Sequence, residues 1–399
     1  MVTKNILRKT IMSSLVMIFL LFFVGAFSFA SELDDVRAAI KEKGSKWIAG
    51  ETSVSKLAPE HRKLRLGLTK HGITGAERLV SAEPPLLGLP ATLDWRHNPL
   101  SNYVTPVRDQ GNCGSCWAFA TTGALESYLL IKNNQLKPDL TNLSEQILVS
   151  CSRAGSCSGG YIDRASDFIR DIGLPGEPCY PYTATNGNCR KACNDWQSNT
   201  DWIDSWSFVA TTSPTVDAIK NALYAYGPLV TTMDVYTDFF YYGSGVYRYG
   251  VGTYEGGHAI LIIGYDDTSQ CFIAKNSWGI GWGEGGFFNI AYSEISYPVE
   301  FGYWTIAYQG AQASCTYSIS PTSRSIDAAG GSGTISVTAD TNCSWTAVSN
   351  AFWIIVTSGS IGAGDESVVY NVSKNTTKKT RKGTITVAGQ QFTVTQSGR

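Results

Sequence analysis

The sequence predicts an α+β fold for the region from Leu93 to about Gln309 and an all-β sandwich for the residues that follow. Two observations lead to this prediction. The first region has helix-like stretches in its first half and strand-like runs after Leu229. After Gln309, short runs that alternate apolar and polar residues are separated by turns rich in Gly, Ser and Asn. The 399 residues of the chain are enough for two such units.

The charge and composition exclude one class of partner. A total of 32 basic against 33 acidic residues gives a formal net charge of -1, so the chain lacks the basic excess of a nucleic-acid-binding protein. We therefore expect no nucleic-acid partner. Charged residues make up 16% of the chain and aromatic residues 12%, which is typical of a folded protein rich in strands and loops.

Residues 1–30 have the pattern of an export signal. Three basic residues precede an uncharged apolar stretch from Ile11 through Phe29, and small residues stand at Ser28 and Ala30. The alternative is a retained membrane anchor, because about 20 apolar residues can span a bilayer. We expect cleavage, no membrane contact afterwards, and a secreted protein, extracellular or periplasmic, whose thiols are mostly oxidised to disulfides.

Residues 31–90 are predicted to form a separate small helical segment. They contain no cysteine, and apolar residues around Val36 recur at helical spacing. A second helix is predicted from Pro59 to Leu68. Prolines and a glycine up to Pro90 then break regular structure, which predicts an exposed connector.

Helices and strands follow in order along the rest of the chain. In the α+β region we predict helices at 117–131, 143–151 and 162–171, and strands at 229–235, 258–265, 271–275 and 286–290. Residues 311–314 are the predicted linker. In the sandwich we predict strands at 335–338, 353–356, 368–372, 384–387 and 392–395.

The strongest local signal for chemistry is the stretch from Gln110 to Phe119, which contains Cys113 and Cys116. A thiol becomes a good nucleophile only as the thiolate, and a helix N-terminus stabilises that anion. Cys116 stands where a Gly-Ser turn gives way to the predicted helix. Two alternatives remain open from these residues alone, because a C-x-x-C pair is also a dithiol redox site or half of a zinc site.

A catalytic cysteine needs a base, and His97 and His258 are the only histidines after residue 90. His258 follows two glycines and begins an apolar run, which predicts a ring held on a strand. Asn276 lies further along the chain and could hold one imidazole nitrogen while the other faces Cys116. Trp278 could then shield that hydrogen bond from water. A purely structural, hydrogen-bonded His258 is the alternative.

Taken together, these stretches resemble the papain-like (cathepsin-type) cysteine proteases. The resemblance covers residues 91 to 309 approximately. It rests on blocks in the same order, namely Leu93–Arg96, Thr105–Val107, Gln110–Phe119, Leu143–Gln146, Cys157–Tyr161 and the stretches around His258 and Asn276. It implies a two-lobed α+β fold, with a helical left lobe and a β-barrel-like right lobe, over a peptidase domain at 91–310. It also implies an endopeptidase that acts on polypeptides.

The resemblance assigns a role to four residues. Cys116 corresponds to the nucleophile, His258 to the general base and then acid, and Asn276 to the residue that orients the ring. Gln110 corresponds to an oxyanion-hole donor beside the backbone N–H of Cys116. In such a site a thiolate and an imidazolium form an ion pair before substrate arrives. We expect no cofactor, no metal site and a monomer.

The resemblance also implies where a substrate binds. Gly160 is expected to hydrogen-bond an extended substrate backbone. The pocket for the second residue before the cut is expected near Tyr161, Ile162, Thr232, Met233 and Ala259, with Trp278 also close to the substrate. We expect this pocket to prefer an apolar side chain.

Disulfide pairs follow from the same resemblance. It implies Cys113 with Cys157 and Cys151 with Cys189. A third pair, Cys179 with Cys193, is a plausible loop cross-link, although these partners could be exchanged. Cys315 and Cys343 fall in the sandwich and are expected to pair there. Cys271 is then left over, and on an apolar strand we expect it to be an inert core residue.

Residues 31–90 resemble the inhibitory pro-segment of the family in position and helicity, but they lack its long helical motif, and a retained helical domain is the alternative. Residues 311–399 resemble the immunoglobulin-like BACON modules of secreted bacterial proteins, which suggests a carbohydrate or cell-surface ligand. Trp345 and Trp353 are candidate sugar contacts, and core packing is the alternative. Two rival functions remain: a catalytically inactive glycan- or surface-binding protein on the same scaffold, and a disulfide oxidoreductase that uses Cys113 and Cys116.

Overall fold

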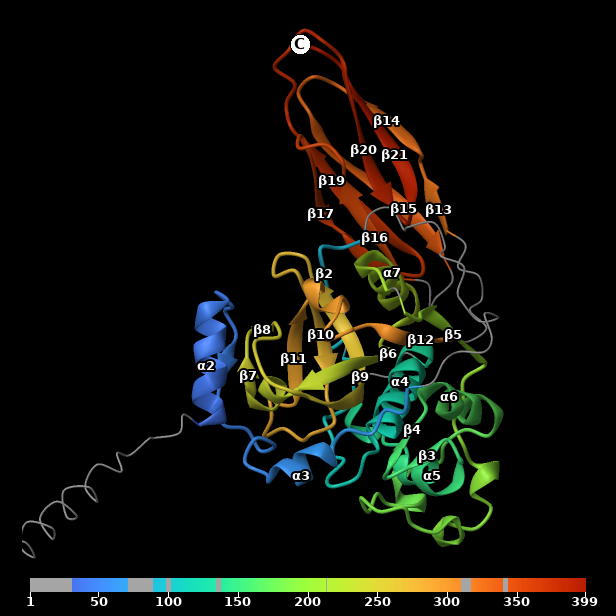
Figure 1. Ribbon diagram of the computed structural model, residues 1–399. Coiled ribbons are helices and arrows are strands. Elements are labelled where there is room, and N and C mark those ends of the chain that lie inside the picture. The colour runs from blue at the N-terminus through green and yellow to red at the C-terminus, as the bar shows by residue number, and fades with distance from the viewer. Residues whose placement is uncertain are drawn as a thin grey trace, which may run out of the picture.

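The computed structural model describes residues 31–70, 89–97, 102–133, 138–212, 214–309, 317–339 and 344–399 (Figure 1). The predicted signal peptide, the predicted linker and the pair Cys315 and Cys343 lie outside the described residues. Within the described part of the chain, no helix has both the length and the apolar character needed to cross a membrane.

The helical lobe of the α+β unit is built around one long buried helix, α4. Its helices are α4 (Cys116–Lys132), α5 (Glu145–Cys151) and α6 (Ile162–Asp171). Short 3-10 helices occur at Pro138–Leu140, Glu177–Cys179, Cys189–Lys191 and Trp196–Ser198, and a small hairpin joins β3 (Gly155–Ser156) to β4 (Gly159–Gly160). Since α4 is apolar on nearly all sides, it packs both against α6 and against the sheet of the second lobe.

The second lobe is an eight-stranded sheet in which neighbouring strands are mostly antiparallel. The strand order is β5 (Ser205–Ala210), β12 (Tyr303–Gln309), β6 (Leu229–Tyr236), β9 (Tyr254–Asp266), β10 (Cys271–Lys275), β11 (Phe287–Ala291) and β8 (Val246–Tyr247), and β2 (Thr92–Asp94) also pairs with β9. Helix α7 (Val216–Tyr226) packs on β5, β9 and β12. Further 3-10 turns occur at Thr237–Tyr241 and Tyr292–Ile295.

The register of this sheet positions the candidate histidine and asparagine. His258 lies on β9 directly opposite Met233 of β6, and Gly257 lies opposite Asp234. Lys275 is the last residue of β10, so Asn276 follows the strand directly. The strand region 258–265 was predicted, and the structure extends it at both ends.

The N-terminal segment, residues 31–70, packs along the second lobe (Figure 1). It contains α2 (Glu32–Glu42), β1 (Ile48–Ala49) and α3 (Pro59–Lys63). Ser31 caps α2, and β1 pairs antiparallel with β7 (Tyr242–Ser244). Trp47 is 2% exposed, and its indole N–H donates to the carbonyl of Arg248 at 3.0 Å.

The predicted second helix of this segment is wrong in its extent. We expected it to continue from Pro59 to Leu68, but α3 ends at Lys63. A turn at Leu64 and Arg65 follows, and the chain then bonds to a distant strand: the N–H of Leu68 donates to the carbonyl of Gly257 at 3.1 Å. Sequence periodicity cannot detect such a partner, because the contact is with a strand far along the chain.

The C-terminal unit is a sandwich of two sheets with its own core. One sheet has the order β13 (Tyr317–Ser320), β15 (Gly331–Ala339), β19 (Glu366–Val372) and β17 (Ile354–Ser358). The other has β14 (Ser323–Ile326), β21 (Gln390–Gln396), β20 (Arg381–Val387), β16 (Ser344–Ser349) and β18 (Ile361–Ala363). All five predicted strand regions are present. Trp345 and Trp353 are 1% and 7% exposed, so their rings pack in this core.

Candidate active site

Cys116 is the first residue of α4, and a disulfide holds the turn before it. Cys113 is bonded to Cys157, and the N–H of Gly114 donates to the carbonyl of Cys157 at 2.8 Å. Cys116 is a free thiol, and the backbone N–H groups of Cys116 and Trp117 act to lower the pKa of its sulfur. The first amides of a helix are therefore directed at the position where a thiolate would form.

His258 and Asn276 form a hydrogen-bonded pair beside this sulfur. Nε2 of His258 lies 2.8 Å from Oδ1 of Asn276, and the ring of Trp278 lies over the imidazole with a centroid distance of 4.7 Å. Nδ1 has no hydrogen-bond partner among the described residues. The backbone N–H of Ala259, the residue after His258, lowers the pKa of the Cys116 thiol, so this part of β9 lies near the sulfur.

Gln110 brings a carboxamide to the same place. Its Nε2 donates to the carbonyl of Cys113 at 2.8 Å and to the carbonyl of Arg65 at 3.1 Å. The hydroxyl of Ser277 donates to Oε1 at 2.7 Å, which fixes the orientation of the amide. The backbone N–H of Ser277 also donates to Oδ1 of Asn276 at 2.7 Å. Sequence reasoning missed Ser277, and its place directly after Asn276 was the available signal.

A buried polar cluster behind the site joins the two lobes. Lys275 donates to Thr105 at 3.0 Å, Thr105 donates to Glu126 at 2.5 Å, and the N–H of Leu143 donates to Glu126 at 3.0 Å. Burial raises the pKa of Glu126, and the nearby Lys275 ammonium opposes that effect. Because Lys275 immediately precedes Asn276, this cluster helps to hold the asparagine at the junction of the lobes.

Gly160 makes the backbone contacts that were predicted for a bound chain, and its partner here is the N-terminal segment. Its N–H donates to the carbonyl of Gly67, and its carbonyl accepts the N–H of Thr69, both at 2.9 Å. The ring of Trp117 lies so close that a β-carbon on Gly160 would overlap it. Only glycine fits here.

The other predicted substrate contacts are spread over both lobes. Ile162 lines a hollow together with Leu68, Phe208 and Trp304. Phe208 and Trp304 were not predicted, because they come from strands far from the motifs. Three more lie elsewhere: Tyr161 contacts the guanidinium of Arg164, Thr232 donates to the carbonyl of Tyr303, and Met233 is buried opposite His258.

The N-terminal segment crosses the site directly over Cys116. The backbone N–H of Gly67 lies within hydrogen-bonding reach of the thiol, while the peptide carbonyl that reaches Gln110 belongs to Arg65. The guanidinium of Arg65 also pairs with Asp109 at 2.5 Å. The sulfur therefore faces an amide N–H of the segment, whereas nucleophilic attack requires a carbonyl carbon.

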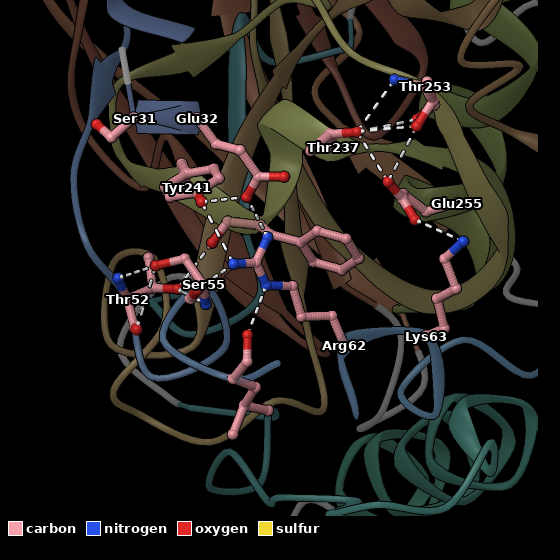
Figure 2. A network of polar contacts seen from close by, with 12 residues as sticks. Ser31, Glu32, Thr52, Ser55, Arg62, Lys63, Thr237, Tyr241, Thr253 and Glu255 are labelled. Atoms are coloured by element: carbon pink, nitrogen blue, oxygen red, sulfur yellow. Dashed lines mark hydrogen bonds and ion pairs between the residues drawn. The ribbon is translucent and has the colours of Figure 1, made fainter. Parts of the chain in front are cut away.

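A second polar network anchors the segment away from the thiol (Figure 2). The guanidinium of Arg62 donates to Glu32 at 2.7 Å and to the carbonyl of Ser55 at 2.6 Å, and the hydroxyl of Tyr241 donates to Glu32 at 2.6 Å. The side chain of Arg62 is only 9% exposed. Tyr241 belongs to the second lobe, so this network ties α2 and α3 to the α+β unit.

Burial under the segment favours the neutral forms of both candidate catalytic groups. It raises the pKa of the Cys116 thiol to about 11, although four backbone N–H groups act in the opposite direction. It lowers the pKa of His258 to about 4, against the effect of the hydrogen bond to Asn276. The ion pair expected from the resemblance is thus disfavoured while the segment covers the site.

The structure joins Cys151 to Cys189 and Cys179 to Cys193, in addition to Cys113–Cys157. The described cysteines without a disulfide are Cys116 and Cys271, both of them buried. Since Cys113 is bonded to Cys157, the two cysteines of the C-x-x-C stretch do not form a dithiol pair in this structure.

A helical lobe and a β lobe that meet at Cys116, His258 and Asn276 define the fold class of the papain-like cysteine proteases. The chain belongs to this family: the description "Papain family cysteine protease" matches residues 89–302. The description "Viral BACON domain" matches residues 316–399.

Individual relatives agree with this assignment. The chain is 37% identical over 209 residues to a cathepsin L-like proteinase of Fasciola hepatica, covering 51% of this chain and 60% of that protein. It is 35% identical over 224 residues to cathepsin L2 of Homo sapiens, covering 53% and 64%. The chain therefore spans less than two thirds of these relatives. The structure of digestive procathepsin L 3 from Tenebrio molitor larval midgut aligns with a TM-score of 0.57 and 26% identity, covering 69% of this chain and 87% of that one.

Proposed function

We propose that this protein is a secreted papain-like cysteine endopeptidase that is made as a zymogen. The observation that carries the proposal is the position of the Cys116 thiol, at the start of α4 and beside the hydrogen-bonded pair of His258 and Asn276. Gln110 supplies a carboxamide N–H at the same place. These are the groups that acyl transfer through a thioester needs.

The proposed reaction begins when the N-terminal segment leaves. His258 takes the thiol proton, and the thiolate of Cys116 attacks a peptide carbonyl carbon of the substrate. The oxyanion that forms is stabilised by the side-chain amide of Gln110 and the backbone N–H of Cys116. His258 then protonates the leaving amine as the C–N bond breaks, which leaves a thioester. Water, deprotonated by His258, hydrolyses the thioester and restores the thiol.

Asn276 acts in this scheme as an orienting residue. It accepts a hydrogen bond from Nε2–H of the imidazole, which leaves Nδ1 available for the proton of Cys116. Trp278 covers the ring and limits the access of water to that bond. The thiolate and imidazolium already carry opposite charges, so a neutral amide is sufficient at this position.

Two features support the zymogen part of the proposal. The segment of residues 65–70 occupies the site by backbone hydrogen bonds to both lobes, through Gly160 and Gly257. The carbonyl of Arg65 in this segment accepts a hydrogen bond from the side-chain amide of Gln110. We propose that the chain comprises a signal peptide at 1–30, an inhibitory pro-segment at 31–90, the peptidase domain at 91–310 and the sandwich at 311–399. The likeness to procathepsin structures supports a pro-segment followed by a peptidase domain.

The C-terminal sandwich is a candidate for attachment to a carbohydrate or a cell surface, as its BACON similarity suggests. Trp345 and Trp353 pack in its core, so a ligand would have to bind through other residues. The competing function, an inactive binding protein, predicts the same sandwich but no turnover of peptides.

Cleavage of a peptide library by the processed protein tests the proposal. We expect wild type to hydrolyse peptides, Cys116→Ala to be inactive, and Gln110→Ala to lose about 10²- to 10³-fold in kcat. An active-site-directed epoxide should label Cys116 of the processed wild type. A folded, processed sample that neither cleaves peptides nor reacts with the epoxide would support the inactive binding protein.

A further inference from the structure

Two carboxylates beside the covered site hold a cation that belongs to the N-terminal segment. The ammonium of Lys70 lies 2.7 Å from Oδ1 and 2.8 Å from Oδ2 of Asp234, and 3.1 Å from Oε2 of Glu300. The side chains of Asp234 and Glu300 are 12% and 27% exposed. The single ammonium of Lys70 therefore pairs with two partly buried carboxylates, whose combined negative charge exceeds its positive charge.

The sheet register places this acidic pair next to the candidate active site. Asp234 of β6 lies opposite Gly257, and the preceding residue lies opposite His258. The carbonyl of Gly257 in turn accepts the N–H of Leu68, and a β-carbon on Gly257 would lie 3.2 Å from the Leu68 side chain. Asp234 is thus one strand away from the point where the segment crosses β9.

The path of the segment shows which part of a substrate would reach the pair. Gly67 lies at the thiol, Leu68 lines the apolar hollow with Ile162 and Trp304, and Lys70 follows two residues later. Side chains two residues apart in an extended chain point to the same side. Lys70 also lines this hollow, so the acidic pair that binds its ammonium lies next to the hollow, on the side of Lys70.

We propose that Asp234 and Glu300 form a specificity subsite for a lysine or arginine side chain of the substrate, on the amino-terminal side of the scissile bond. This inference rests on the proposed function and on the expectation, from the family resemblance, that the pocket for the second residue before the cut lies near Ile162, which lines the apolar hollow. Lys70 occupies the subsite in the uncleaved protein, and a basic substrate side chain replaces it after the segment leaves. The substrate class is a peptide with an apolar residue followed, further from the cut, by a basic one.

Two properties of the pair fit this role. Burial raises the pKa of Asp234, and Lys70 opposes that effect, so the carboxylate gains from a cationic partner. Asp234 is also fixed in place, because its backbone N–H donates to the carbonyl of Val299 at 2.7 Å. Glu300 follows Val299 directly, so the same backbone bond sets the spacing of the two carboxylates.

The test uses processed enzyme and matched peptides that have an apolar residue at the second position before the cut and carry either lysine or acetyl-lysine at the third or fourth position. Acetylation removes the charge and keeps the aliphatic chain. We expect lysine to be preferred about tenfold in kcat/KM at one of these positions, as is typical of a hydrogen-bonded ion pair. The preference should fall several-fold in Glu300→Gln and disappear in the double variant with Asp234→Asn.

Asp139→Asn, which removes a charge from an exposed turn of the helical lobe, should keep the full preference. Equal rates for lysine and acetyl-lysine peptides at both positions in an active wild type would overturn the subsite. So would an unchanged preference in both Glu300→Gln and the double variant. No cleavage of any peptide by wild type would instead count against the peptidase function, so the two failures are distinguishable.

Discussion

The backbone of Gly67 lies so close to Gly114 that a β-carbon on Gly67 would overlap the Gly114 backbone. Gly114 precedes Cys116 in the turn that begins α4, so this contact brings the N-terminal segment within reach of the thiol. The absence of a side chain at residue 67 is what allows the segment to cover the sulfur.

Gly67→Ala should therefore weaken inhibition by the segment. Overlap with a backbone cannot be relieved by a side-chain rotation, and overpacking of this kind costs about 1–3 kcal/mol, or roughly 5- to 100-fold in binding. We expect the uncleaved variant to be labelled faster at Cys116 by an epoxide. Gly50→Ala is the control, since a β-carbon there has open space. Equal labelling of the two variants would contradict the prediction.

The reactivity of Cys116 should depend on pH differently before and after the segment is removed. With the segment in place the thiol pKa is about 11, so the thiolate fraction at pH 7 is of the order of 10⁻⁴. Its alkylation by iodoacetamide should be slow at pH 7 and rise towards pH 11. Removal of the segment relieves the burial that raises the thiol pKa and lowers that of His258. The processed enzyme should then react rapidly at neutral and mildly acidic pH, and identical profiles would refute this account.

The network of Glu32, Arg62 and Tyr241 should make docking of the segment sensitive to acid. The hydrogen bond from Tyr241, and then that from Arg62, lowers the pKa of Glu32 below its ordinary value of 4.5. A carboxylate with a lowered pKa stabilises the docked state above its ordinary pKa, and this contribution is lost as the pH falls through the lowered value. Glu32→Gln should release the segment about two- to fivefold faster at neutral pH and show a shallower acid dependence.

The rate of processing, measured from neutral pH to well below pH 4.5, would check this result. Glu42→Gln removes the same charge from the exposed end of α2 and serves as the matched control. If both variants keep the wild-type pH profile, the network is not an acid-sensitive anchor.

Ser277 should act on catalysis only through Gln110. Loss of its hydrogen bond to Oε1 frees the carboxamide to rotate, so Ser277→Ala should lower kcat about two- to tenfold with little change in KM. In a variant that already carries Gln110→Ala, Ser277→Ala should lower kcat much less, because the carboxamide that Ser277 orients is absent. Ser269→Ala, which removes an exposed hydroxyl contact to Asp266, should be neutral. Additive losses in the double variant would argue for an independent role.

The fold class and the candidate catalytic residues could be predicted because the necessary information is local. Cys116 stands at a recognisable junction of turn and helix, and Asn276 follows a short apolar strand. The path of residues 67–69 could not be predicted, because hydrogen bonds to the backbones of Gly160 and Gly257, far along the chain, fix it. Strand β14 was missed for a related reason: it is short and mostly exposed, so it shows no alternation.

The residues around the apolar hollow illustrate the same limit. Phe208 and Trp304 come from β5 and β12, which reach the hollow only through sheet order and register. A sequence without relatives aligned to it contains no signal for such long-range neighbours. Ser277 was different, since its position next to Asn276 already placed it near the site.

The segment that covers Cys116 and the domain that contains it are parts of one chain, joined between Lys70 and Leu89. While that connection is intact, the covering segment rebinds at an effective concentration in the range of about millimolar, however dilute the protein is. A single cut in the connection would convert the tethered segment into an ordinary dissociable ligand. Dilution of the cleaved protein would then dissociate the segment and expose Cys116, and concentrating the protein would restore the covered state.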